Sequence, residues 1–108
     1  MSNIELDKIF FSLANTNRRL ILSLLVAQDL SVGLISRKSK MSIALASKHL
    51  QVLVKCELVT AVKNGRNKIY KLNLSKFSKA NVWIGSLGLL DSLDTSRLEN
   101  FLSSENLL

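Results

Sequence analysis

The chain has 108 residues, of which 47% are hydrophobic and 21% charged, and its formal net charge is +7. This length predicts one domain with a modest core, and the hydrophobic fraction argues against a disordered chain. The lone Cys56 excludes an internal disulfide and a multi-cysteine metal site within one chain. The apolar run over 20–27 is far shorter than the ~20 residues that span a bilayer, and the N-terminus lacks a signal-peptide pattern. We therefore expect a cytoplasmic protein without a membrane partner.

Apolar residues at positions 6, 9, 10 and 13 have the spacing of one helix face, which predicts a first helix over 4–13. Asn15 or Thr16 is the expected N-cap of a second helix that ends near residue 28. Its core side is predicted to carry Leu20, Ile21, Leu24 and Leu25. We expect Arg18 and Arg19, at the start of this helix, to form structural ion pairs or phosphate contacts.

Ser31 is the expected cap of a short third helix, and Ser42 is the natural cap of a fourth. At about 100° per residue, one side of the fourth helix faces inward, and the opposite side forms an exposed strip. The strip consists of Ala44, Ser47, Lys48 and Gln51. Small, hydroxyl, cationic and amide side chains suit contact with a DNA groove. His49 falls close to the inward side, which leaves either a packing role or a phosphate contact.

Asn64-Gly65 is a strong β-hairpin signal, because both residues tolerate positive φ, and strand-like residues flank it. After the hairpin, apolar residues from 83 to 102 recur at roughly helical spacing, which predicts a C-terminal helix over about 77–102. Gly85 and Gly88 weaken this helix in isolation. It therefore needs a partner surface, which points to docking against another chain.

The positive charge is concentrated in one part of the chain. Residues 37–79 hold eleven basic residues and one acidic residue, a net charge of +10, whereas residues 1–36 are balanced and residues 80–108 carry −3. Because the basic block coincides with the predicted third and fourth helices and the hairpin, it indicates a polyanionic partner. A merely solvated basic face is the alternative.

Helix, turn, helix and hairpin follow one another in the order of a winged helix-turn-helix, a shape that fits the DNA major groove. We therefore expect a mostly α fold with a small β-hairpin, in which four helices precede the hairpin and one follows it. A single domain over 1–108 would hold a helix-turn-helix at about 31–55, a wing at about 58–72 and the C-terminal dimerisation helix.

Four segments in the same order resemble the ArsR/SmtB-type winged-helix transcriptional regulators, which are small homodimeric repressors of bacteria. Residues 13–25 read LANTNRRLILSLL, similar to the family's LADPTRRxILxLL, and LSVGLI follows at 30–35. Residues 47–53 read SKHLQVL, similar to the family's S-R/Q-H-L-x-x-L. The wing segments, Leu58-Val59 and NGR to IYKL over 64–72, complete the resemblance.

The resemblance implies that residues 42–55 form a recognition helix whose N-terminal half enters the major groove, and that the wing reaches phosphate or the minor groove. The DNA-contacting residues that we expect are Lys40, Ser42, Ile43, Ala44, Ser47, Lys48, His49, Gln51, Lys63, Arg66 and Lys68. It also implies a homodimer built from the first and the C-terminal helix. The expected interface residues are Leu6, Phe10, Trp83, Leu87 and Leu90.

The chain departs from the family pattern in two places. Ile43-Ala44-Leu45 replaces a stretch that is usually polar, so apolar contact with thymine methyl groups would substitute for hydrogen-bond readout. The known inducer sites are also missing: Ser31 and Gly33 stand at the positions of the metal-binding cysteines, and the C-terminal helix has no histidine. We therefore expect no cofactor and no metal, and the effector, if any, is unidentified.

These observations favour a sequence-specific DNA-binding transcriptional regulator, a homodimeric repressor of a near-palindromic operator. Its partners would be double-stranded DNA and a second copy of the chain. One alternative is a protein-interaction module that uses Ile43 and Leu45 as an apolar patch. Another is a regulator that senses a ligand or metal at an unrecognised site. One histidine, one cysteine and few acidic residues provide no catalytic set, so we expect no enzyme.

Overall fold

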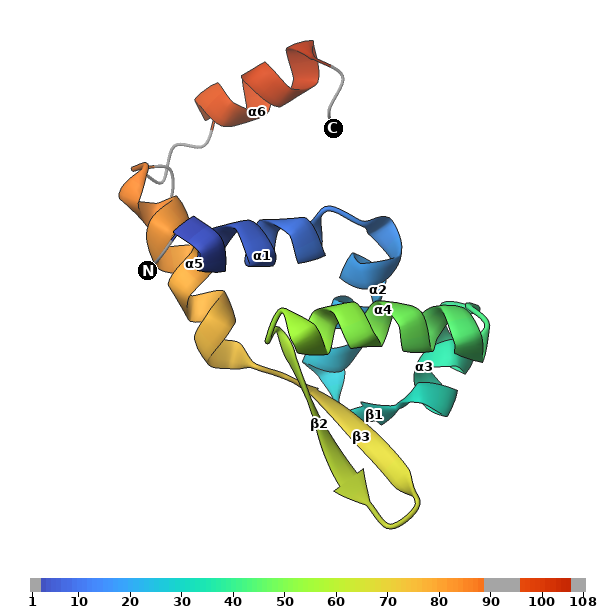
Figure 1. Ribbon diagram of the computed structural model, residues 1–108. Helices are drawn as coiled ribbons and strands as arrows, with labels where there is room; N and C mark the ends of the chain where they lie inside the picture. The colour runs from blue at the N-terminus through green and yellow to red at the C-terminus, as the bar shows by residue number, and fades with distance from the viewer. Residues whose placement is uncertain (1–2, 89–95, 106–108) are drawn as a thin grey trace. The chain divides into compact units, whose positions relative to one another are not determined.

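The computed structural model describes residues 3–88 and 96–105 and divides into two compact units, residues 1–77 and 78–108. The elements that lie wholly in the first unit are α1 (Asn3–Leu13), α2 (Thr16–Ala27), β1 (Leu30–Ser31), α3 (Val32–Ser39), α4 (Ile43–Lys55), β2 (Val59–Asn64) and β3 (Asn67–Leu72) (Figure 1). Helix α5 (Leu74–Ser86) begins at the end of this unit and continues into the second, which also contains α6 (Ser96–Ser104). Among the described residues, no helix is both long enough and apolar enough to cross a membrane.

The expected mostly α winged helix-turn-helix is confirmed, with one addition to its sheet. The short strand β1 pairs antiparallel with β3 through Leu30–Tyr70 and Ser31–Ile69, so the sheet has three strands in the order β1-β3-β2. Figure 1 shows the β2–β3 hairpin projecting past α4, with β1 alongside β3. Pairing with β1 therefore connects the middle of β3 to the start of the helix-turn-helix.

Helices α2, α3 and α4 begin where the sequence placed them, because each has a side-chain cap. Asn15 Oδ1 accepts a hydrogen bond from the Arg18 N–H at 3.0 Å. Ser31 Oγ accepts one from the Leu34 N–H at 3.3 Å and thereby opens α3. Such caps satisfy N–H groups that have no partner inside the helix.

The turn of the hairpin lies one residue later than Asn64-Gly65. Asn64 pairs with Asn67 at the end of the ladder, so the two-residue loop consists of Gly65 and Arg66. Gly65 adopts φ +66°, the left-handed conformation that glycine tolerates at the first position of a type II′ turn. The shift places Arg66 at the tip of the wing.

The expectation of one continuous C-terminal helix over 77–102 is wrong. Helix α5 ends at Ser86, and Gly88 adopts φ +77° with its N–H bonded to the Gly85 carbonyl at 2.9 Å. A glycine in the left-handed conformation is a common end of an α-helix. Residues 89–95 lie outside the described residues, and α6 begins at Ser96.

The buried side of α2 differs from the predicted one. Arg18, Ile21, Leu22 and Leu25 are its buried residues, whereas Leu20 is 40% exposed and Leu24 half-buried. Positions 18, 21, 22 and 25 follow the i, i+3, i+4, i+7 spacing of one helix face. The inward stripe therefore begins with an arginine, a residue type that is almost never fully buried without a partner.

Arg18 is buried because its guanidinium donates hydrogen bonds to carbonyl groups at the end of α1. Its Nε donates to the Ser12 carbonyl at 2.8 Å and its Nη2 donates to the Phe11 carbonyl at 2.9 Å. The guanidinium carbon also lies 5.0 Å from the centre of the Phe11 ring. Arg19 Nη1 donates to the Leu13 carbonyl at 2.7 Å, in an exposed position. Both arginines thus bind backbone carbonyls at the end of α1, where the sequence had predicted ion pairs or phosphate contacts.

Candidate nucleic-acid interface

The turn between α3 and α4 is held by hydrogen bonds among its own residues. Ser36 Oγ donates to the Met41 carbonyl at 2.6 Å, and the Met41 N–H donates to Ser39 Oγ at 3.2 Å. Lys40 ends α3 in the left-handed conformation with φ 63°, and its side chain is exposed. Since the Met41 side chain is buried, the turn is anchored to the core at the point where α4 starts.

Helix α4 is anchored on one side by Ala46, Leu50 and Leu53, each at most 1% exposed. The opposite side carries the reading strip, defined as Ala44, Ser47, Lys48 and Gln51, of which Ser47 is half-buried and the others exposed. The core contacts thus fix which side of α4 faces outward. A helix held in this way can present one row of side chains to a groove.

The first turn of α4 is capped and apolar. Ser42 Oγ accepts a hydrogen bond from the Leu45 N–H at 3.1 Å, as expected of an N-cap. Ile43 is 58% exposed and Leu45 is 37% exposed. These side chains have no hydrogen-bonding groups, so the base feature that they can recognise is the thymine methyl group.

The expected basic DNA contacts are exposed and lack carboxylate partners in the part of the chain that the structure describes. Ion pairs of the described residues include Lys71 with Asp29 at 4.0 Å, and Lys76 with Glu57 at 3.0 Å and with Glu5 at 3.8 Å. None of the five expected contacts has a described carboxylate within 4.0 Å. They are Lys40, Lys48, Lys63, Arg66 and Lys68. Their charges are available to a polyanion.

His49 lies at the edge of the reading strip and is half-buried. Burial lowers the pKa of its imidazole below the ordinary 6.5, and the positive charges of Arg18 and Lys48 lower it further. The folded protein therefore favours a neutral imidazole next to the helix surface that is expected to meet DNA. This position is compatible both with packing and with a phosphate contact, the two roles that the sequence left open.

We expect the pKa of His49 to lie below 6.5 in the folded protein. Since the unfolded chain takes up this proton at higher pH than the folded chain does, the free energy of unfolding should decrease as the pH falls below 6.5. His49 is the chain's single histidine, so an NMR titration of the imidazole signals reports it without ambiguity. A pKa at or above the ordinary value would contradict the described surroundings.

The expected dimer-interface residues are divided between the two units. In the first unit, Leu6 and Phe10 on α1 are half-buried. In the second unit, Trp83 is 42% exposed and Leu87 is 53% exposed, while Leu90 lies outside the described residues. Further large apolar side chains are exposed that the sequence pattern did not single out, because a helical period does not say which apolar positions lack a partner. They include Ile4, Phe11 and Val82.

Comparison with a protein-family model matches residues 15–61 to the family described as bacterial regulatory protein, arsR family. The matched segment runs from the N-cap of α2 into β2 and includes the complete helix-turn-helix. A comparison with curated proteins gives no match.

Solved structures share the fold over most of the chain. An ArsR-like transcriptional regulator from Rhodococcus sp. RHA1 is 27% identical, with 93% of this chain and 92% of that chain covered and a TM-score of 0.73. HlyU from Vibrio cholerae N16961 is 27% identical, with 83% and 97% covered and a TM-score of 0.65. Mb0332 from Mycobacterium bovis, described as a homodimeric winged helix-turn-helix DNA-binding domain, is 25% identical, with 84% and 92% covered and a TM-score of 0.66.

Proposed function

Residues 15–61 of this chain belong to the ArsR family of bacterial regulatory proteins, and we propose that this DNA-binding transcriptional regulator is a cytoplasmic, homodimeric repressor of a near-palindromic operator. The observation that carries the proposal is the outward side of α4. It carries the reading strip, in which Lys48 has no described carboxylate partner, on a helix held by its core contacts and by a hydrogen-bonded turn.

In the proposed complex, the α4 helices of two protomers enter successive major grooves, about 34–36 Å apart. Ser47, Lys48 and Gln51 contact base edges, and the exposed Ala44 and Leu45 contact thymine methyl groups. The basic residues of the turn and the wing neutralise phosphates. Binding therefore releases counterions and weakens with added salt. Repression follows if the bound dimer blocks RNA polymerase.

The proposed dimer is supported by the apolar side chains that a single chain leaves exposed. Ile4 and Phe11 on α1 are 69% and 60% exposed, and Val82 on α5 is 71% exposed. Burial of this apolar surface against a second copy of the chain would stabilise the dimer by roughly 25 cal/mol per Å² of apolar area buried. The Mycobacterium bovis domain with the same fold is described as homodimeric.

In-vitro selection of bound DNA from a random library tests the proposal directly. The expected result is an enriched sequence with two related half-sites whose centres lie about one helical turn, or a multiple of it, apart. A library that yields no enriched sequence would overturn sequence-specific binding. Enrichment of a single unrepeated half-site would instead overturn the symmetric dimer on DNA.

Removing the wing charges with the double variant Arg66→Ala/Lys68→Ala is expected to weaken binding to every DNA sequence and to flatten its salt dependence. Each phosphate contact that is lost should reduce the slope of log K against log salt by about 0.9. Fluorescence anisotropy over a salt series measures this slope. The double variant Lys8→Ala/Lys79→Ala removes the same charge from exposed positions on α1 and α5, so its slope should stay close to that of the parent. An unchanged slope in the wing variant would argue against a wing that contacts DNA.

A second candidate function is protein recognition through Ile43 and Leu45, which is favoured by their exposure of 58% and 37%. Such a module would not enrich any DNA sequence, so the same selection separates the two functions. In that case, replacing the exposed Ile43 with serine should abolish binding of the protein partner.

A further inference from the structure

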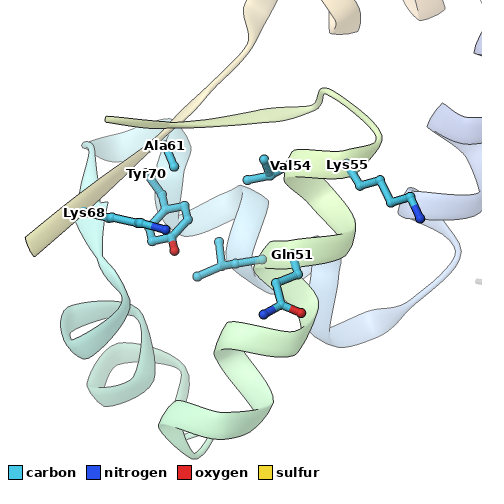
Figure 2. Close-up of a pocket in the computed structure, with 7 residues that line it drawn as sticks. Gln51, Val54, Lys55, Ala61, Lys68 and Tyr70 are labelled. Carbon is cyan, nitrogen blue, oxygen red and sulfur yellow. The ribbon is translucent and has the colours of Figure 1, made fainter. Parts of the chain in front are cut away.

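A groove of about 240 Å³ lies between α4 and the wing in the first unit. Its lining comes from two turns of α4 and from facing positions of β2 and β3 (Figure 2). The lining residues are Leu50, Gln51, Val54, Lys55, Ala61, Lys68 and Tyr70. The groove adjoins the reading strip through Gln51 and the wing charges through Lys68.

The walls of the groove are mainly hydrocarbon. Leu50 and Val54 contribute from α4, and Ala61 contributes from β2. Ala61 pairs directly with Tyr70 across the hairpin, so the small side chain leaves space beside the aromatic ring. Figure 2 shows Tyr70 and Lys68 next to each other on the wing, across from Gln51, while the end of Lys55 points away from them.

The polar groups at the groove are hydrogen-bond donors without partners among the described residues. The Lys68 ammonium, the Tyr70 hydroxyl and the Gln51 amide have no hydrogen bond or ion pair to residues 3–88 or 96–105. Donors above an apolar floor are complementary to a ligand with a hydrocarbon body and one negative group. A phosphodiester alone would bind weakly in the groove, because the apolar walls cannot replace the hydrogen bonds that it makes with water.

We propose that this groove binds a small organic acid, with its aromatic or aliphatic body against Leu50, Val54 and Ala61 and its carboxylate at Lys68 and Tyr70. Gln51 and Lys68 are also among the DNA contacts of the proposed function, on which this step rests. The acid and the operator therefore compete for the same side chains, and occupation of the groove releases DNA. The site is separate from the third-helix and C-terminal positions at which the sequence lacks sensor residues.

The binding of 1-naphthoate tests the site, with the uncharged 1-naphthamide as the matched probe. In a titration of the isotope-labelled protein without DNA, 1-naphthoate should shift the backbone amide signals of Gln51, Ala61 and Tyr70 in a saturable way. We expect 1-naphthamide to bind about tenfold or more weakly, because it lacks the carboxylate. Adding 1-naphthoate to the complex with selected DNA should release the DNA.

Neighbouring positions on β2 provide matched variants. Ala61→Trp fills the groove and should abolish 1-naphthoate binding. Val62 pairs with Ile69 and alternates to the other side of the strand, so Val62→Trp places the same indole outside the groove and should leave binding intact. Circular dichroism and thermal unfolding establish that both variants are folded. The shifts of the backbone amide signals in the parent protein test the site without any variant.

Four results would overturn the proposal. These are signal shifts confined to other residues, equal affinity for the acid and the amide, equal loss in both tryptophan variants, and acid binding that leaves the DNA complex unchanged. If the ligand-free protein binds no selected DNA, the proposed function fails and the competition fails with it. The titration without DNA still decides whether the groove is an acid-binding site.

Discussion

Replacing Lys48 with glutamate is expected to abolish specific DNA binding and to leave the fold unchanged. Lys48 is exposed in the middle of the reading strip, with no carboxylate of the described residues within 4.0 Å. The substitution removes a donor to base edges or phosphates and places a negative charge against the DNA. A good base contact is worth about 1–3 kcal/mol, and a dimer loses it twice. We therefore expect an affinity loss of about 100-fold or more.

The matched control is Lys8→Glu, which makes the same charge change at an exposed position on α1. It alters the net charge equally, so a general loss of attraction for DNA would appear in both variants. Fluorescence anisotropy with the selected operator measures affinity, and sedimentation establishes that both variants have the same oligomeric state. If Lys48→Glu bound the operator as well as Lys8→Glu does, α4 would not be the helix that enters the groove.

The helix-turn-helix was predictable because its signals are local in sequence. Ser31 and Ser42 cap the helices that they precede, since a hydroxyl at that position satisfies a free N–H of the same turn. The exposure of Ala44, Lys48 and Gln51 follows from the spacing of the buried Ala46 and Leu50. These features need no knowledge of the rest of the chain. This is why the family resemblance and the periodicity agree over this segment.

The features that escaped prediction depend on contacts between distant residues or on one backbone angle. Arg18 faces inward because carbonyl groups of α1 receive it, and the periodicity of α2 alone gives no sign of them. The end of α5 depends on the left-handed conformation of Gly88, which the apolar spacing over 83–102 does not reveal. The groove beside Tyr70 arises from the register that pairs it with Ala61. In each case the residue type permits the observed structure without requiring it.

Replacing Arg18 with methionine is expected to destabilise the first unit substantially, although the residue is outside the proposed DNA interface. Methionine matches the aliphatic stem of arginine but cannot donate to the Ser12 and Phe11 carbonyls. Arg18 is 8% exposed, and its bond to Ser12 is buried, so water does not readily replace the lost donors. Leaving buried acceptors unpaired costs about 2–3 kcal/mol. For a domain of this size, the unfolding temperature should fall by about 10–20 °C.

Arg19→Met is the control, because Arg19 carries the same charge one residue later and reaches the Leu13 carbonyl from an exposed position. Water can take over that bond, so the free energy of unfolding should change by at most about 0.5 kcal/mol.

His49 supplies an independent readout, since the charge of Arg18 is one cause of its lowered pKa. Arg18→Met should raise the pKa of His49, but not to the ordinary value, because burial is the larger cause and remains. Equal destabilisation by the two substitutions would mean that a charge near the end of α1 matters and the buried hydrogen bonds do not. A larger loss in Arg18→Met, together with the shifted pKa, would instead establish that the first arginine of the pair holds α1 against α2 and so supports the surface that α4 presents.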